Sequence, residues 1–298
     1  MKILRRWPAT SLVILALVIT YLVGIPIAMA LRPLEKSLGL RNELLSLWVM
    51  RWGATFAGLI VLAAVSGRPG FQVWLTQLFR WRVNAGYYVF IYSSALIIFS
   101  LSLLLAFGLF PPPSATQGFA VTPAVLGSYL AEIAYITVTN GEETGWRFVL
   151  LGLLLARTRL FSASLLVGCA WVFWHLPMYI WLGGGGLTMF APFVFIGLGL
   201  SIILAWLYKA TNSLLLPVLF HGAVNATTYS FERNFPGLAE ALDATGAVGE
   251  WMYAAALLPL VVVIVLMNRT MFFGQVDFPA GENWADRSTT EVRVARAG

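Results

Sequence analysis

Long apolar segments are the feature that most constrains the fold of this chain. Eight of them reach or approach the roughly 20 residues that an α-helix needs to cross about 30 Å of hydrocarbon. They lie near residues 11–31, 45–65, 87–110, 124–156, 160–182, 187–208, 213–229 and 251–267. Inside lipid, every backbone polar group must be hydrogen-bonded within the protein, so such segments form helices. The sequence therefore predicts an all-α polytopic membrane protein with about eight transmembrane helices.

Composition and charge agree with this fold class. Only 11% of the 298 residues are charged, whereas about a quarter are charged in a soluble domain. We expect one transmembrane helical domain over residues 1–270, with its functional core at 124–230, and a polar, disordered cytoplasmic tail at 271–298. The first apolar segment is longer than the roughly 7 to 15 residues of a cleavable signal peptide, so we expect it to remain as a helix.

The basic residues indicate how the chain is oriented. Most of the 19 lysines and arginines fall on one side of the predicted membrane when the N-terminus is placed inside. The positive-inside rule then predicts a multi-pass protein, in the plasma membrane of a prokaryote, with both termini cytoplasmic. Topology and anionic headgroups account for the net charge of +6, so membrane lipid is an expected partner and nucleic acid is not. The single cysteine, Cys169, is expected to pack within its apolar segment.

Several polar side chains interrupt the apolar segments, and each is a functional candidate because polar groups are unfavourable in hydrocarbon. They are Arg51, Glu132, Glu142, Glu143, Arg147, His175, His221 and Asn225. Glu143 and Arg147 are four residues apart, which on a helix predicts an ion pair. Glu142 is turned by about 100° from Glu143, so it is expected to point elsewhere.

The spacing of the other candidates predicts one common site. His221 and Asn225 are four residues apart and share a helix face, and His175 follows Trp171 by four residues. At about 1.5 Å per residue, counting from the cytoplasmic ends places Glu142, His175 and Asn225 about 20 Å along three different helices. These three helices are therefore expected to bring their polar groups to one layer of the membrane.

The residue types in this layer suit hydrolysis by an activated water molecule. A buried carboxylate beside an imidazole can take a proton from water. A second imidazole and an amide on one helix face can donate hydrogen bonds to a developing oxyanion. Such a site can hydrolyse an amide or an ester without a serine or cysteine nucleophile and without a cofactor.

Three short motifs in this region resemble those of a known family. "EETGWR" at 142–147, Trp171 with His175, and His221 with Asn225 resemble, in order, the Glu-Glu-x-x-x-Arg, Phe-x-x-x-His and His-x-x-x-Asn motifs of the CAAX protease and bacteriocin-processing family. These proteins, also called Abi or type II CAAX proteases, are intramembrane glutamic endopeptidases. The resemblance covers residues 141–225. Trp171 stands where the family has Phe, and its ring is expected to stack against His175.

The resemblance implies a role for each matching residue. It implies that Glu142 and His175 activate the water, and that His221 and Asn225 form the oxyanion hole. It also implies that Glu143 and Arg147 support the site, with Arg147 holding the carboxylates in place. The implied partner is a protein or peptide substrate at the membrane, with or without a lipid; in eukaryotic relatives it is a prenylated C-terminal CAAX protein.

Other interpretations of the same residues stay open at this point. A zinc hydrolase could use a glutamate, His175 and His221 as ligands, although the sequence has no His-Glu-x-x-His pair. A non-enzymatic immunity protein or scaffold could use the charged residues as an ion-pair cluster between helices. A proton-coupled carrier could use the glutamates as a relay, although the chain shows no internal repeat. Glu132 could line a cavity or lie at the interface, and Arg51 could snorkel to the surface.

Overall fold

The computed structural model describes residues 2–38, 50–110 and 121–274, and over these residues it contains helices and no strand. This confirms the all-α fold class. The helices, in chain order, are α1 (Lys2–Arg6), α2 (Pro8–Leu17), η1 (Val18–Gly24), α3 (Ile25–Ser37), α5 (Gly53–Val65), α6 (Gly67–Leu78), α7 (Ala85–Leu109), α8 (Pro123–Thr139), η2 (Thr144–Leu150), α9 (Leu151–Leu155), α10 (Leu160–Trp181), α11 (Gly186–Thr211), α12 (Leu215–Asn234), α13 (Pro236–Asp243), α14 (Ala247–Met267) and α15 (Arg269–Phe273).

Five helical stretches in the described part of the chain are long and apolar enough to cross a membrane, and the chain is an integral membrane protein. They are Pro8–Ser37, Ala85–Leu109, Leu160–Trp181, Gly186–Thr211 and Ala247–Met267. The other three predicted crossings have different forms. Segment 45–65 lies partly outside the described residues and continues as the short helix α5, segment 213–229 becomes the more polar α12, and segment 124–156 is divided. The number of eight crossings stays a prediction.

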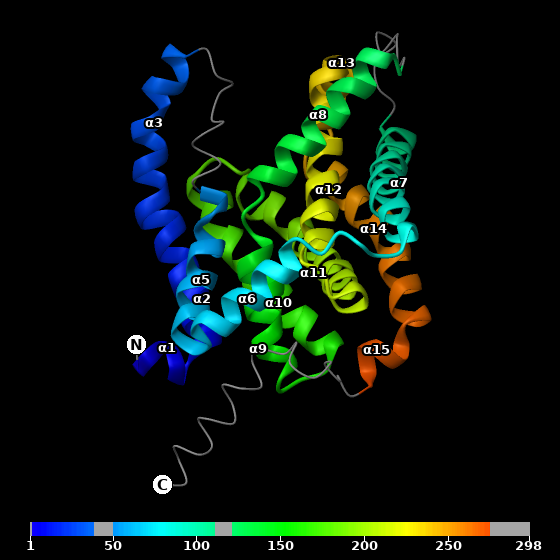
Figure 1. The fold of residues 1–298 in the computed structure, drawn as a ribbon. Helices are drawn as coiled ribbons and strands as arrows, with labels where there is room; N and C mark the ends of the chain where they lie inside the picture. Colours follow the sequence, from blue (N-terminus) through cyan, green and yellow to red (C-terminus); the bar gives the residue numbers. More distant parts are fainter. Residues whose placement is uncertain (1, 39–49, 111–120, 275–298) are drawn as a thin grey trace, which may run out of the picture.

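The helices form a bundle whose centre is occupied by α10, α11 and α12 (Figure 1). On one side, α2, η1 and α3 run on as a single long helix, and α2 packs against α5. On the opposite side, α7 packs against α14. α10 packs against α11, and α12 packs against α7, α8 and α11. The helices that carry His175 (α10) and His221 (α12) therefore lie in the interior of the bundle.

The prediction of one helix within residues 124–156 is wrong, because the chain leaves the helical path between α8 and η2. Residues 140–142 have no helical conformation, and Glu143 is the N-cap of η2. Side chains from the start of α5 bind the carbonyl groups exposed by this break. The indole Nε1 of Trp52 donates to the carbonyl oxygen of Thr139 at 3.2 Å, and the Thr55 hydroxyl donates to that of Gly141. The break is thus stabilised by specific hydrogen bonds from the neighbouring segment.

Glycine allows η2 to lie directly against α5. A Cβ atom on Gly145 would overlap the backbone carbonyl of Ala54, and a Cβ on Gly58 would lie 2.9 Å from the Cα of Gly145. Small residues that let two helix backbones approach are typical of packing inside membranes. This close approach fixes the start of η2, and with it the glutamates that precede it.

Two further expectations differ from the structure. Cys169 is exposed on the surface of α10, so its expected packing role is wrong. Residues 271–273 belong to α15, where Phe272 is fully buried and its ring contacts that of Phe161, so helical structure extends past residue 270. The rest of the predicted tail, 275–298, lies outside the described residues.

We expect Gly145→Ala to destabilise the protein, because the new methyl group overlaps the backbone of α5. Overpacking of this kind lowers the free energy of unfolding by about 1–3 kcal/mol. The matched control is Gly127→Ala, since a Cβ on Gly127, in α8, meets no atom within 4 Å. Thermal unfolding of both variants in detergent measures the difference. An equal midpoint for the two variants would contradict the close packing of η2 on α5.

Candidate active site

The structure brings the predicted site residues to a single cavity of about 420 Å³. Its lining includes Glu142 from the turn before η2, His175 from α10, and His221 and Asn225 from α12. Glu142 and His221 are buried, whereas His175 and Asn225 are partly exposed to the cavity. Glu142 thus reaches the site from the non-helical turn between α8 and η2 and not, as predicted, from the middle of a helix.

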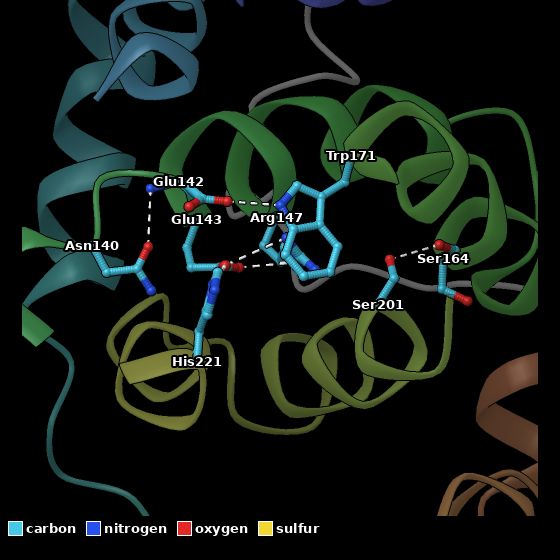
Figure 2. Close-up of polar contacts among 8 residues, drawn as sticks. All are labelled: Asn140, Glu142, Glu143, Arg147, Ser164, Trp171, Ser201 and His221. Carbon is cyan, nitrogen blue, oxygen red and sulfur yellow. Dashed lines mark hydrogen bonds and ion pairs between the residues drawn. The ribbon is translucent and has the colours of Figure 1, made fainter. Parts of the chain in front are cut away.

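Trp171 binds two residues of the cavity lining, Glu142 and His175. Its indole Nε1 donates to Oε2 of Glu142 at 2.7 Å (Figure 2). Its backbone carbonyl oxygen lies 2.9 Å from Nδ1 of His175 and can only accept, so Nδ1 carries the proton. The second oxygen of Glu142 and the Nε2 lone pair of His175 are therefore the acceptors left for a ligand in the cavity.

The second glutamate forms a separate buried network behind the cavity. Arg147 Nη1 donates to Oε1 of Glu143 at 3.3 Å, and Arg147 Nε lies 3.1 Å from Oε2 in an ion-pair contact without hydrogen-bond geometry. Both side chains are fully buried. The predicted ion pair is present. Arg147 contacts Glu143 directly and lies over the ring of Trp171, and its role in holding Glu142 stays a prediction.

His221 connects this network to the cavity. Its Nδ1 lies 2.7 Å from Oε1 of Glu143, and an ionised carboxylate only accepts, so Nδ1 is the donor (Figure 2). Nε2 of the same ring is not used in this bond. Asn225, one helical turn further along α12, lines the same cavity. The two residues on one face of α12 can therefore present an imidazole nitrogen and an amide to a single ligand.

Aromatic rings surround His175 on several sides. The ring centroids of Trp171, Trp174 and Phe193 lie 5.3, 4.6 and 5.0 Å from that of His175. Trp171 meets His175 edge-on, with an interplanar angle of 84°, so the expected stacking of these rings is wrong. The guanidinium of Arg147 instead lies over the Trp171 ring at 4.9 Å. This apolar surround restricts the imidazole to one orientation.

The remaining polar candidates separate into two groups. Glu132 forms an ion pair with Arg233 at 2.5 Å and does not line this cavity. Arg51, just before α5, does line the cavity, and its Nη2 donates to the hydroxyl of Tyr229 at 3.0 Å. The sequence makes Arg51 a candidate because of its place in an apolar segment, but it does not indicate that Arg51 lines the same cavity as Glu142.

The zinc interpretation needs carboxylates and imidazoles that are grouped around one point and available to a metal ion. Among the described residues, no three His, Cys, Asp or Glu side chains form a group that could hold a metal ion. Glu143 already accepts from Arg147 and His221, and one oxygen of Glu142 accepts from Trp171. These carboxylates are arranged as acceptors for protein donors.

Comparison with known proteins identifies the class to which this buried carboxylate and imidazole site is similar. Residues 128–227 match the family model of type II CAAX prenyl endopeptidases, Rce1-like. A stretch of 92 residues is 32% identical to CAAX prenyl protease 2 of Methanococcus maripaludis, covering 28% of this chain and 34% of that protein. The chain thus matches about a third of the length of this curated relative. Residues 128–227, which match the family model, contain all three motifs, and this confirms the resemblance to the CAAX protease and bacteriocin-processing family.

We expect single substitutions in the Glu143–Arg147 pair to be more damaging than the removal of both charges. Glu143→Gln or Arg147→Met alone leaves one buried charge without its partner, which lowers stability by about 3–5 kcal/mol. The double variant has no unpaired charge and should recover at least half of the lost stability. Thermal unfolding of the four proteins in detergent tests this coupling. Losses that simply add in the double variant would contradict it.

Proposed function

We propose that this chain is an intramembrane endopeptidase that hydrolyses a peptide bond with water activated by Glu142 and His175. The observation that carries the proposal is that Trp171 binds two residues of one cavity. Its indole donates to Glu142 and its carbonyl accepts from His175, and each of these side chains keeps one acceptor atom that is not used in these bonds. Two fixed acceptors can take both protons of one water molecule, which directs an oxygen lone pair at a bound carbonyl carbon.

The proposed reaction begins with transfer of a proton from the water to Glu142. The water oxygen forms a bond to the peptide carbonyl carbon, and the carbonyl electrons move to its oxygen. His221 and the amide of Asn225, on one face of α12, stabilise this oxyanion, the term that often contributes most to such reactions. The carbon–nitrogen bond then breaks, and the leaving amine takes the proton back from Glu142. The products are a carboxylic acid and an amine.

The Glu143–Arg147 pair supports this chemistry without lining the cavity. Glu143 accepts a hydrogen bond from Nδ1 of His221 and so holds the imidazole against the cavity. Arg147 in turn neutralises Glu143 and lies over the ring of Trp171. The pair therefore fixes the orientation of His221 and Trp171, which hold the reacting groups.

The proposed substrate is a protein or peptide at the membrane, with a CAAX-type C-terminus, lipidated or not. The similarity to type II CAAX prenyl endopeptidases and to the Methanococcus maripaludis CAAX prenyl protease 2 supports this class. The proposed setting is the plasma membrane of a prokaryote, with both termini cytoplasmic and with membrane lipid around the helices, as the distribution of basic residues favours.

Cleavage of prenylated CAAX peptides by the purified protein in detergent tests the proposal. Glu142→Gln and His175→Ala should each lower kcat/KM by about 10²–10⁴-fold, the range for loss of general-base catalysis. Glu240→Gln removes an exposed glutamate of α13 and is the matched control. Full activity in both site variants would contradict the proposal. Loss of activity with a zinc chelator would favour the metal-dependent alternative, and an intact protein without any cleavage would favour a carrier or scaffold.

Trp171→Phe isolates the contribution of the indole to catalysis. This change keeps a ring beside His175 and Arg147 but removes the donor to Glu142. A hydrogen bond to a charged group is worth about 1.5–3 kcal/mol, so we expect kcat to fall roughly tenfold or more with little change in KM. Trp181→Phe, at an exposed tryptophan of the same helix, is the control. Equal kcat values for the two variants would show that the indole does not position Glu142.

A further inference from the structure

Arg51, which lies just before α5, is a cation that the proposed chemistry does not use. It lines the same cavity as Glu142 and His175. Its guanidinium donates to the hydroxyl of Tyr229 and lies 5.9 Å from the centre of that ring. It forms no ion pair with a carboxylate of the described residues. A guanidinium has five N–H donors, so most of them are left for another acceptor.

The other charges around the cavity restrict where an anionic ligand can bind. Arg51 is the only lysine or arginine among the described residues that line it. Three acids, Glu232, Asp243 and Glu250, line the part formed by the end of α12, by α13 and by the start of α14. An anion near these acids would be repelled. Within this cavity, therefore, an anion is favoured beside Arg51.

We propose that Arg51 binds the C-terminal carboxylate of the peptide substrate, so that the enzyme selects peptide bonds a few residues from a free C-terminus. The inference rests on the endopeptidase function proposed above. An arginine fork matches a carboxylate in shape and binds it through two parallel hydrogen bonds. The hydroxyl and ring of Tyr229 hold the guanidinium in place for this contact.

The position along α12 suits this role. Tyr229 follows Asn225 by four residues and therefore lies one turn, about 6 Å, further along the same helix. An extended peptide advances about 3.3 Å per residue. A peptide whose scissile carbonyl lies at Asn225 can thus place its C-terminus beside Arg51 within a few residues. The distance from this cation to the reacting groups then limits how long the released fragment can be.

A second role for Arg51 makes a different experimental prediction. The Glu143–Arg147 pair is neutral by itself, which leaves the charge of Glu142 to be balanced, and Arg51 is the cation that shares its cavity. If charge balance were the whole role, replacing Arg51 would affect every peptide alike. Binding of the carboxylate requires that the loss depends on the C-terminus of the peptide.

The test compares two prenylated CAAX peptides that are identical except for a free C-terminal carboxylate or a neutral carboxamide. Affinities are measured with the full chain carrying Glu142→Gln, so that binding is scored without cleavage, and kcat/KM is measured with active Glu142. We expect the free acid to be preferred about tenfold to a hundredfold, the range of a hydrogen bond to a charged group. Arg51→Met should bring this ratio close to one.

Two further variants keep the outcome clear. Tyr229→Phe leaves the ring but removes the hydroxyl that holds Arg51, and it should give an intermediate ratio even if Arg51→Met does not fold. Arg68→Met removes an exposed arginine of α6 outside the cavity and should keep the wild-type ratio.

Three results overturn the proposal. The protein with Arg51 in place could bind the free acid and the carboxamide equally well, the preference for the free acid could survive in Arg51→Met, or neither peptide could bind. If the free acid is preferred and Arg51→Met abolishes the preference, but neither peptide is cleaved, the carboxylate site stands and the endopeptidase function fails.

Discussion

The site depends above all on the buried carboxylate of Glu143. Its contacts with Arg147 and His221 join the start of η2 to α12, two elements far apart in the sequence. An unpaired charge in this fully buried position would be strongly unfavourable, so the network fixes both helices relative to each other. Because Glu142 precedes Glu143 directly, fixing one glutamate also determines where the other points. The structural charge pair and the proposed reacting group are thus set by adjacent residues.

Trp171 provides the second constraint, between α10 and the turn before η2. The indole donates to Glu142 while the backbone carbonyl of the same residue binds His175. One residue therefore sets the positions of both proposed proton acceptors. Preorganised groups of this kind need little rearrangement when a substrate binds. The phenylalanine of the family motif has no such donor, so this chain holds its glutamate in a way that the motif alone does not indicate.

Much of this arrangement could be predicted from the sequence, and the rest could not for physical reasons. The apolar segments predicted an all-α membrane protein, and the four-residue spacing of Glu143 and Arg147 predicted their ion pair. The break between α8 and η2 was missed, although Asn140–Gly141 is a typical turn dipeptide, because the apolar residues on both sides favoured one helix. The contact between Trp171 and Glu142 joins residues 29 positions apart. The spacing of residues along one helix does not predict contacts between distant helices. For the same reason it does not predict that Arg51 lines the cavity of Glu142.

A crystal structure of the protein with a bound phosphinic peptide, whose tetrahedral centre imitates the attack of water on a carbonyl, would show which side chains surround the reacting carbon. We expect one phosphinic oxygen between Glu142 and Nε2 of His175, and the other within hydrogen-bond distance of Nε2 of His221 and the amide of Asn225. A metal ion between the carboxylate and the imidazoles, or a tetrahedral centre bound away from Glu142, would contradict it.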